Sequence, residues 1–81
     1  MEKAEIVKFM QDICKQRKLL QSMGKSYKLA DSHTILQIES ASKWNDPTTW
    51  LRDNILLVRQ VCPQRMYKTY EKLVKHLFNQ K

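Results

Sequence analysis

The chain has 81 residues, of which 42% are hydrophobic and 28% are charged, and its formal net charge is +7. This length accommodates one domain at most, and the composition is that of a folded chain. No stretch approaches the roughly 18 consecutive apolar residues of a membrane span, and the N-terminus mixes acids with bases, so we expect neither a membrane segment nor a secretory signal. We predict a single helical domain over residues 1–81 of an intracellular protein, cytoplasmic or nuclear.

Several kinds of chemistry have no support in the sequence. Gly24 is the only glycine, which excludes the glycine-rich loops that bind nucleotide phosphates. Cys14 and Cys62 lie far apart, and neither has a second ligand at the spacing typical of structural zinc sites, although His33 and His76 would complete a set of four if folding brought them together. We therefore expect no metal, no cofactor and two reduced thiols.

The sequence also gives little support for catalysis. Asp31, Ser32 and His33 are consecutive, so they cannot form a catalytic triad with one another, and capping of a helix explains the first two better. Cys62 would be a reactive thiol if it began the last helix, but it also completes an apolar line on the helix before it. We predict that the protein is not an enzyme.

The first element is a predicted helix over residues 2–23. Its apolar residues recur with the 3.6-residue period, and Gly24 provides the left-handed residue that commonly ends a helix. Arg17 falls within the apolar stripe of this helix. We expect its stem to lie along the edge of the core, with the guanidinium in water or on a carboxylate, unless it faces a partner.

The segment from residue 25 to 44 has two interpretations. Asp31 or Ser32 can cap a short helix that ends at Ala41, but alternating apolar residues also suit a β-hairpin over residues 26–39, pairing Tyr27 and Leu29 with Leu36 and Ile38. We favour the helix, because an isolated two-stranded ribbon is only marginally stable and no glycine-containing turn joins the strands.

Two further helices complete the prediction. Asp46 is a suitable N-cap, Pro47 fits the first helical position, and a broad apolar arc predicts a central helix that continues to Val61. Pro63 should break the chain before a last helix over residues 63–79. The expected fold is an all-α bundle of three to four helices, with a core of Ile6, Met10, Ile13, Leu51, Ile55, Val58, Tyr70, Leu73 and Leu77.

The positive charge is concentrated in the last helix. Residues 63–81 contain 5 basic residues and 1 acidic residue, a net +4 of the total +7. Apolar residues occupy one side of the predicted helix, and an arc of about 80° on the other side carries Arg65, Lys68, Lys72 and Lys75. A solvated polar face usually mixes charges of both signs, whereas Glu71 alone interrupts this one. Cations in a row along a helix can neutralise successive phosphates.

The leading hypothesis is therefore binding of nucleic acid, with DNA favoured over RNA and little sequence preference. Lys15 and Lys18 form a possible second patch. A helix-turn-helix across Cys62 and Pro63 is a weaker variant, because the preceding helix looks too long and the turn too tight. A membrane-surface role is disfavoured, because the apolar side of the last helix is needed for the core.

The competing hypothesis is a protein-interaction module: a small adaptor, inhibitor or regulatory subunit. It would bind an acidic or helical partner, or a second copy of itself as a homodimer. Arg17, Trp44 and Trp50 would be its anchors, since tryptophan and arginine are enriched at binding hot spots. In small domains, however, tryptophans more often seal the core.

Overall fold

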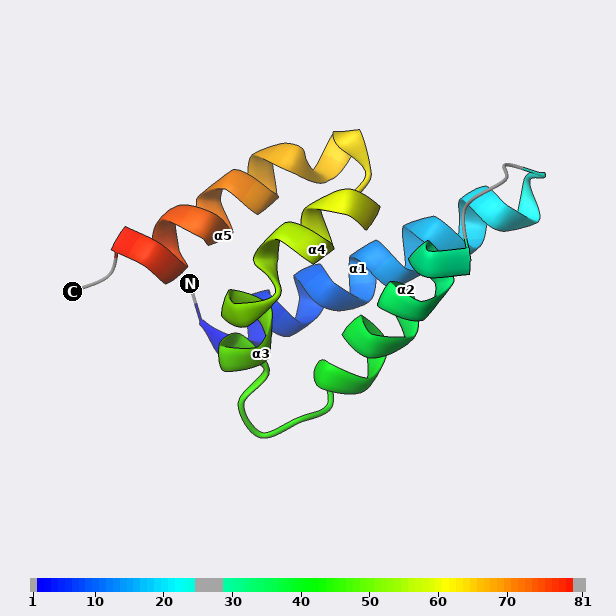
Figure 1. The fold of residues 1–81 in the computed structure, drawn as a ribbon. Helices are drawn as coiled ribbons and strands as arrows, with labels where there is room; N and C mark the ends of the chain where they lie inside the picture. Colours follow the sequence, from blue (N-terminus) through cyan, green and yellow to red (C-terminus); the bar gives the residue numbers. More distant parts are fainter. Residues whose placement is uncertain (1, 25–28, 80–81) are drawn as a thin grey trace.

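The computed structural model describes residues 2–24 and 29–79, and these residues form helices and connecting turns without any strand (Figure 1). This confirms the all-α fold, but with five α-helices in place of the expected three to four. In chain order the elements are α1 (Lys3–Ser22), α2 (Leu29–Ala41), α3 (Pro47–Asp53), α4 (Ile55–Val61), the 3-10 turn η1 (Gln64–Met66) and α5 (Tyr67–Asn79).

Helix α1 matches the sequence prediction closely. It buries Ile6, Phe9, Met10 and Ile13 on one face, as the 3.6-residue period requires. Gly24 follows the helix with a φ of +81°, in the region that L-residues with a side chain rarely adopt. The glycine therefore ends the helix for the predicted conformational reason.

Helix α2 shows that the β-hairpin alternative is wrong for residues 29–39, while residues 26–28, including Tyr27, lie outside the described residues. In the helix, Ile35 and Ile38 both reach the core, where α2 packs against α1 and α4. A two-stranded ribbon would lack this burial. Because α2 begins at Leu29, Asp31 and Ser32 lie inside its first turn, so the prediction that one of them is the N-cap is also wrong.

The predicted central helix is two helices, α3 and α4, separated at Asn54. Its start is as predicted: Asp46 accepts a hydrogen bond from the backbone N–H of Thr49 at 3.2 Å, and Pro47 is the first helical residue. At Asn54 the backbone leaves helical geometry, with φ −121° and ψ 24°. The Asn54 side-chain amide donates to the carbonyl of Trp50 at 2.8 Å. Asparagine side chains compete in this way with the backbone ladder, which is why an uninterrupted helix was the wrong expectation.

Helix α5 runs antiparallel to α3 and α4. The chain turns at Cys62 and Pro63, where Cys62 is extended, and η1 leads into α5. Three contacts join α5 to α3 and α4. In order along α5 they are Tyr67 with Arg59, Tyr70 with the carbonyl of Ile55, and Phe78 with Arg52. The contacted residues of α3 and α4 have falling numbers while those of α5 rise, so the two segments run in opposite directions. This side-by-side arrangement differs from the steeply crossed helices of a helix-turn-helix, so that variant is set aside.

The core lies between these helices. Eight of the nine predicted core residues are buried, and the ninth, Ile55, packs against the cluster while partly exposed. Sequence analysis missed the contribution of α2, whose Ile35, Ile38 and Ala41 are all within the core. Leu73 of α5 is fully buried, which fixes the side of this helix that faces inward and therefore the side that faces solvent.

Candidate nucleic-acid interface

Exposed basic residues follow one another along η1 and α5. Lys68, Lys72 and Lys75 lie on the outward side of α5, whereas Arg65 lies in the preceding 3-10 turn, so the prediction of one helix from residue 63 is wrong: α5 begins at Tyr67. We call these four residues the basic face. All four side chains are exposed, and in the described part of the chain none forms an ion pair or hydrogen bond. The inward side of the helix places Tyr70, Leu73 and Leu77 in the core, about half a turn away. The structure thus brings the four predicted residues together on one surface.

Two arginines that the sequence analysis did not select lie beside the basic face. Arg52 of α3 and Arg59 of α4 are exposed, and their guanidinium carbons lie 5.8 Å from the ring centroids of Phe78 and Tyr67, respectively. This distance is within the range of cation–π attraction. No local pattern marks these arginines, because only the antiparallel packing of α5 brings them to the same surface.

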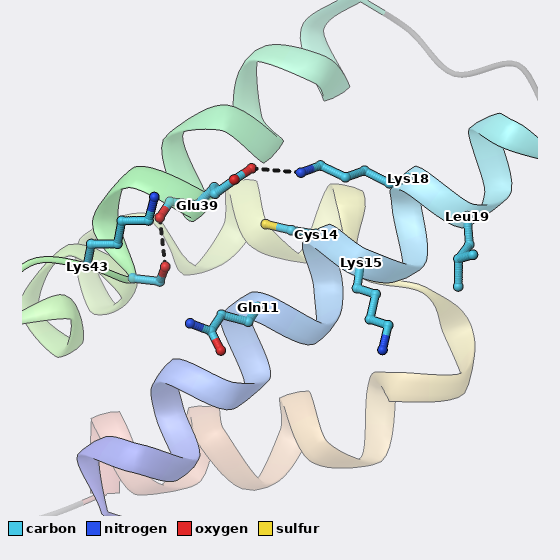
Figure 2. Close-up of a pocket in the computed structure, with 8 residues that line it drawn as sticks. Gln11, Cys14, Lys15, Lys18, Leu19, Glu39 and Lys43 are labelled. Carbon is cyan, nitrogen blue, oxygen red and sulfur yellow. Dashed lines mark hydrogen bonds and ion pairs between the residues drawn. The ribbon is translucent and has the colours of Figure 1, made fainter.

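Both residues of the predicted second patch, Lys15 and Lys18, lie at the groove between α1 and α2, but their side chains point in different directions. Figure 2 shows Lys18 directed toward α2, where its ammonium group lies 3.1 Å from the carboxylate of Glu39, while Lys15 points away from this pair. Lys15 lines this α1–α2 groove as well, and it also lines a second groove, between α1 and the start of α5, together with Arg65. Lys15 therefore adjoins the basic face, and Lys18 is partly neutralised by an acid.

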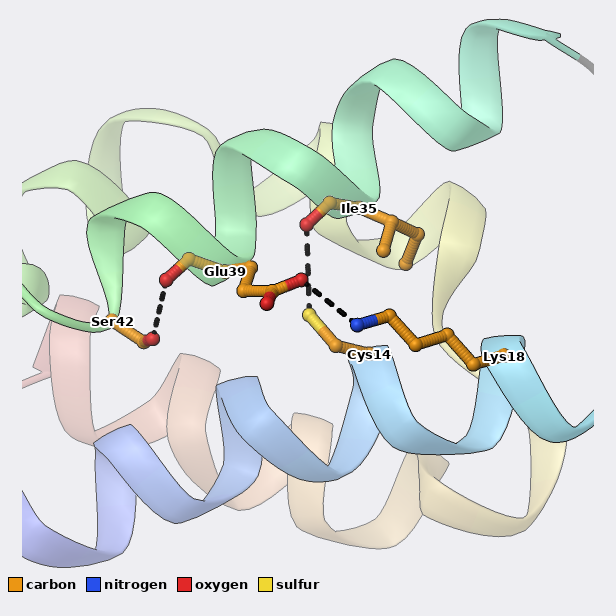
Figure 3. Close-up of polar contacts among 5 residues, drawn as sticks. All are labelled: Cys14, Lys18, Ile35, Glu39 and Ser42. Atoms are coloured by element: carbon orange, nitrogen blue, oxygen red, sulfur yellow. Dashed lines mark hydrogen bonds and ion pairs between the residues drawn. The ribbon is translucent and has the colours of Figure 1, made fainter.

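The groove between α1 and α2 has a volume of about 420 Å³. Lys18 and Glu39 lie at its edge together with Lys43, and Cys14 lies in its wall (Figure 2). Figure 3 shows that the Cys14 thiol points between the helices and donates a long hydrogen bond, 3.6 Å, to the carbonyl of Ile35. The Ser42 hydroxyl donates to the carbonyl of Glu39 at 2.7 Å and so satisfies an end of α2. Of the contacts at this groove, the Cys14–Ile35 hydrogen bond and the Lys18–Glu39 ion pair join α1 to α2.

The three predicted partner anchors have different surroundings. Arg17 donates from Nε to the carbonyl of Val61 at 2.6 Å, so its guanidinium binds the end of α4 where a carboxylate or water was expected. Trp50 packs against the core. Trp44, in the loop between α2 and α3, is 51% exposed. Of the three, Trp44 alone presents a large free surface.

Neither cysteine has the environment of a reactive thiol. Burial raises the pKa of both the Cys14 and the Cys62 thiol from 9.0 to about 11. The nearby Glu39 carboxylate raises the pKa of Cys14 further, whereas Arg17 opposes the effect at Cys62. In the described residues, no three histidine, cysteine or acidic side chains are grouped as metal ligands would be.

These thiols give a prediction of pH dependence. Because the folded state raises both thiol pKa values, it retains protons that the unfolded chain loses, so the free energy of unfolding should fall as pH rises from 9 through 11. Urea unfolding followed by circular dichroism should show a steeper loss over this range than the Cys14→Ala, Cys62→Ala variant. At pH 7 Ellman's reagent should label the folded protein slowly and the urea-unfolded protein fast. Rapid labelling of the folded protein would contradict the assignment.

Comparison with known proteins assigns no family to this chain. No protein-family model matches the chain, and neither the curated proteins nor the solved structures include a significant match to it. Within residues 2–24 and 29–79, no helix has both the length and the apolar character needed to cross a bilayer. The surface chemistry of the molecule is therefore the guide to its function.

Proposed function

We propose that this chain is a non-enzymatic protein that binds nucleic acid, DNA in preference to RNA, through the basic face of α5. The observation that supports this proposal is the exposure of Lys68, Lys72 and Lys75 along α5, with Arg65 in the turn before it, all without acidic partners from the described residues. A positive charge left unpaired in this way is available to neutralise phosphates and to release their counterions. Lys15 extends the surface beside Arg65.

This mode of binding predicts a steep dependence on salt. Four phosphate contacts on duplex DNA give a slope of about −3.6 for the logarithm of the association constant against the logarithm of salt concentration, so affinity should fall about 150-fold between 50 and 200 mM salt. The measurement is fluorescence anisotropy with a DNA duplex of random sequence. An RNA duplex of the same length tests the preference for DNA. Absence of binding to the duplex, to the RNA and to a single DNA strand at 50 mM salt would refute the proposal.

A second candidate function, a protein-interaction module, is favoured by one observation, the exposure of Trp44. Docking of an exposed aromatic anchor into a partner depends far less on salt than phosphate binding does. The same titration therefore separates the two functions. If no nucleic acid binds, the search for an acidic or helical protein partner, or for a homodimer, becomes the next step, with Trp44→Ala as its first variant.

A further inference from the structure

Two aromatic rings, those of Tyr67 and Phe78, are exposed where α5 packs against α3 and α4. Tyr67 is 36% exposed and Phe78 is 50% exposed. They are eleven residues apart, close to three full turns, so they lie on the same side of α5 at a separation of about 16 Å along its axis. Two exposed rings at this spacing form a repeated feature on one side of the helix.

Each ring lies within cation–π distance of an arginine from α3 or α4. The guanidinium carbons of Arg59 and Arg52 lie 5.8 Å from the centroids of Tyr67 and Phe78, respectively. The contact fixes the ring against α4 or α3 and leaves the rest of the ring in solvent. Both partners of such a pair have flat surfaces that can stack on a nucleobase. Because the pairs are formed within the chain, little ordering of these side chains would oppose binding.

The rings lie beside the basic face along α5, and the exposed Glu71 lies between them on the same side of the helix. Lys68 follows Tyr67 directly in sequence, and Lys75 lies three residues before Phe78, so each ring has a lysine of the basic face on the adjacent side of the helix. Phosphate-binding cations beside exposed aromatic rings are the combination found in proteins that bind single strands. In a duplex the bases are paired and stacked on one another, so the rings would have no free base to contact.

We infer that the ligand of this surface is single-stranded nucleic acid, with its phosphates on the basic face and its bases stacked on the Tyr67–Arg59 and Phe78–Arg52 pairs. This inference rests on the proposed function and specifies its substrate class. Lys68, Lys72 and Lys75 then follow the backbone of the strand, and the two pairs hold bases about three helical turns apart. Stacking is tolerant of sequence, because every base has a flat face.

The test compares an oligo(dT) strand, which does not pair with itself, with a mixed-sequence duplex of the same length. Anisotropy titrations use the full chain, the Tyr67→Leu, Phe78→Leu double variant, and a Trp44→Leu control. Leucine keeps an apolar side chain at each site but removes the flat ring. Trp44 is an exposed aromatic residue in the loop between α2 and α3, which lies on the other side of the molecule from α5 (Figure 1).

We expect the wild-type chain to bind oligo(dT) more tightly than the duplex. The double variant should weaken oligo(dT) binding by roughly tenfold or more, change duplex binding by less than about twofold, and keep its circular dichroism spectrum, while the Trp44 variant should change neither affinity. Equal loss for strand and duplex, or no loss for the strand, would overturn the inference while leaving the proposed function in place. Absence of binding to both ligands would overturn the proposed function as well.

Discussion

Reversal of three charges on the basic face, Lys68→Glu, Lys72→Glu and Lys75→Glu, should weaken nucleic-acid binding by about two orders of magnitude or more. Each substitution replaces attraction to a phosphate by repulsion. The residual binding should also lose its salt dependence, because few counterions remain to be released. The fold should persist, since all three side chains are exposed and none is paired within the described residues. Anisotropy at 50 mM salt and circular dichroism measure the two effects.

The matched comparison uses two double variants of equal charge. Lys72→Glu, Lys75→Glu reverses two lysines of the basic face, and Lys3→Glu, Lys43→Glu reverses two exposed lysines away from it. Both double variants lower the net charge from +7 to +3, because each substitution changes the charge by two units. Only the first should strongly weaken binding if the position of the charge matters beyond the total charge. Equal losses in the two double variants would show that the site assignment is wrong.

Removal of the one acid of residues 63–81, by Glu71→Gln, should have the opposite effect and tighten binding a few-fold. The same anisotropy titration measures it.

The second large effect concerns the packing that presents the basic face. Leu73→Ala should lower the free energy of unfolding by about 2–5 kcal/mol, because it removes a fully buried side chain and leaves a cavity. This is a large part of the about 5–15 kcal/mol that stabilises a typical domain. Urea unfolding followed by circular dichroism measures the loss.

The control for this prediction is the same substitution on the surface, Leu56→Ala. Leu56 is 74% exposed, so the change should stay within about 0.5 kcal/mol. If the two variants were equally stable, α5 would not be packed as described, and the side of the helix that faces solvent would have to be reassigned. The comparison therefore also tests the geometry on which the basic face depends.

Much of the local structure follows from short-range sequence signals. Gly24 ends α1, Asp46 and Pro47 begin α3, and Pro63 interrupts the chain before the last helix, in each case because the residue itself restricts the backbone or satisfies an end group. The errors have local causes too. The break at Asn54 coincides with a side-chain hydrogen bond to the carbonyl of Trp50, which also accepts the backbone N–H of Asn54, and periodicity does not register such a bond.

For α2 the sequence was ambiguous because its apolar residues fit both a helical and an alternating period. The helix is favoured once Ile35 and Ile38 are buried against α1 and α4, and this burial depends on residues far away in the chain. The same reasoning applies to Arg17, whose partner proved to be the backbone of Val61. A carbonyl at the end of another helix cannot be identified from residue type alone.

The sequence by itself determined the all-α class, most of the core and the shared face of Lys68, Lys72 and Lys75 in α5, because amphipathic periodicity within one helix fixes which side chains share a face. Only the tertiary structure decided what lies beside that face. The antiparallel packing of α5 on α3 and α4 placed Arg52 and Arg59 over Phe78 and Tyr67, and the α1–α2 contact joined Lys18 to Glu39. These pairs join residues distant in sequence, whose proximity arises from burial of the common core and not from any local pattern.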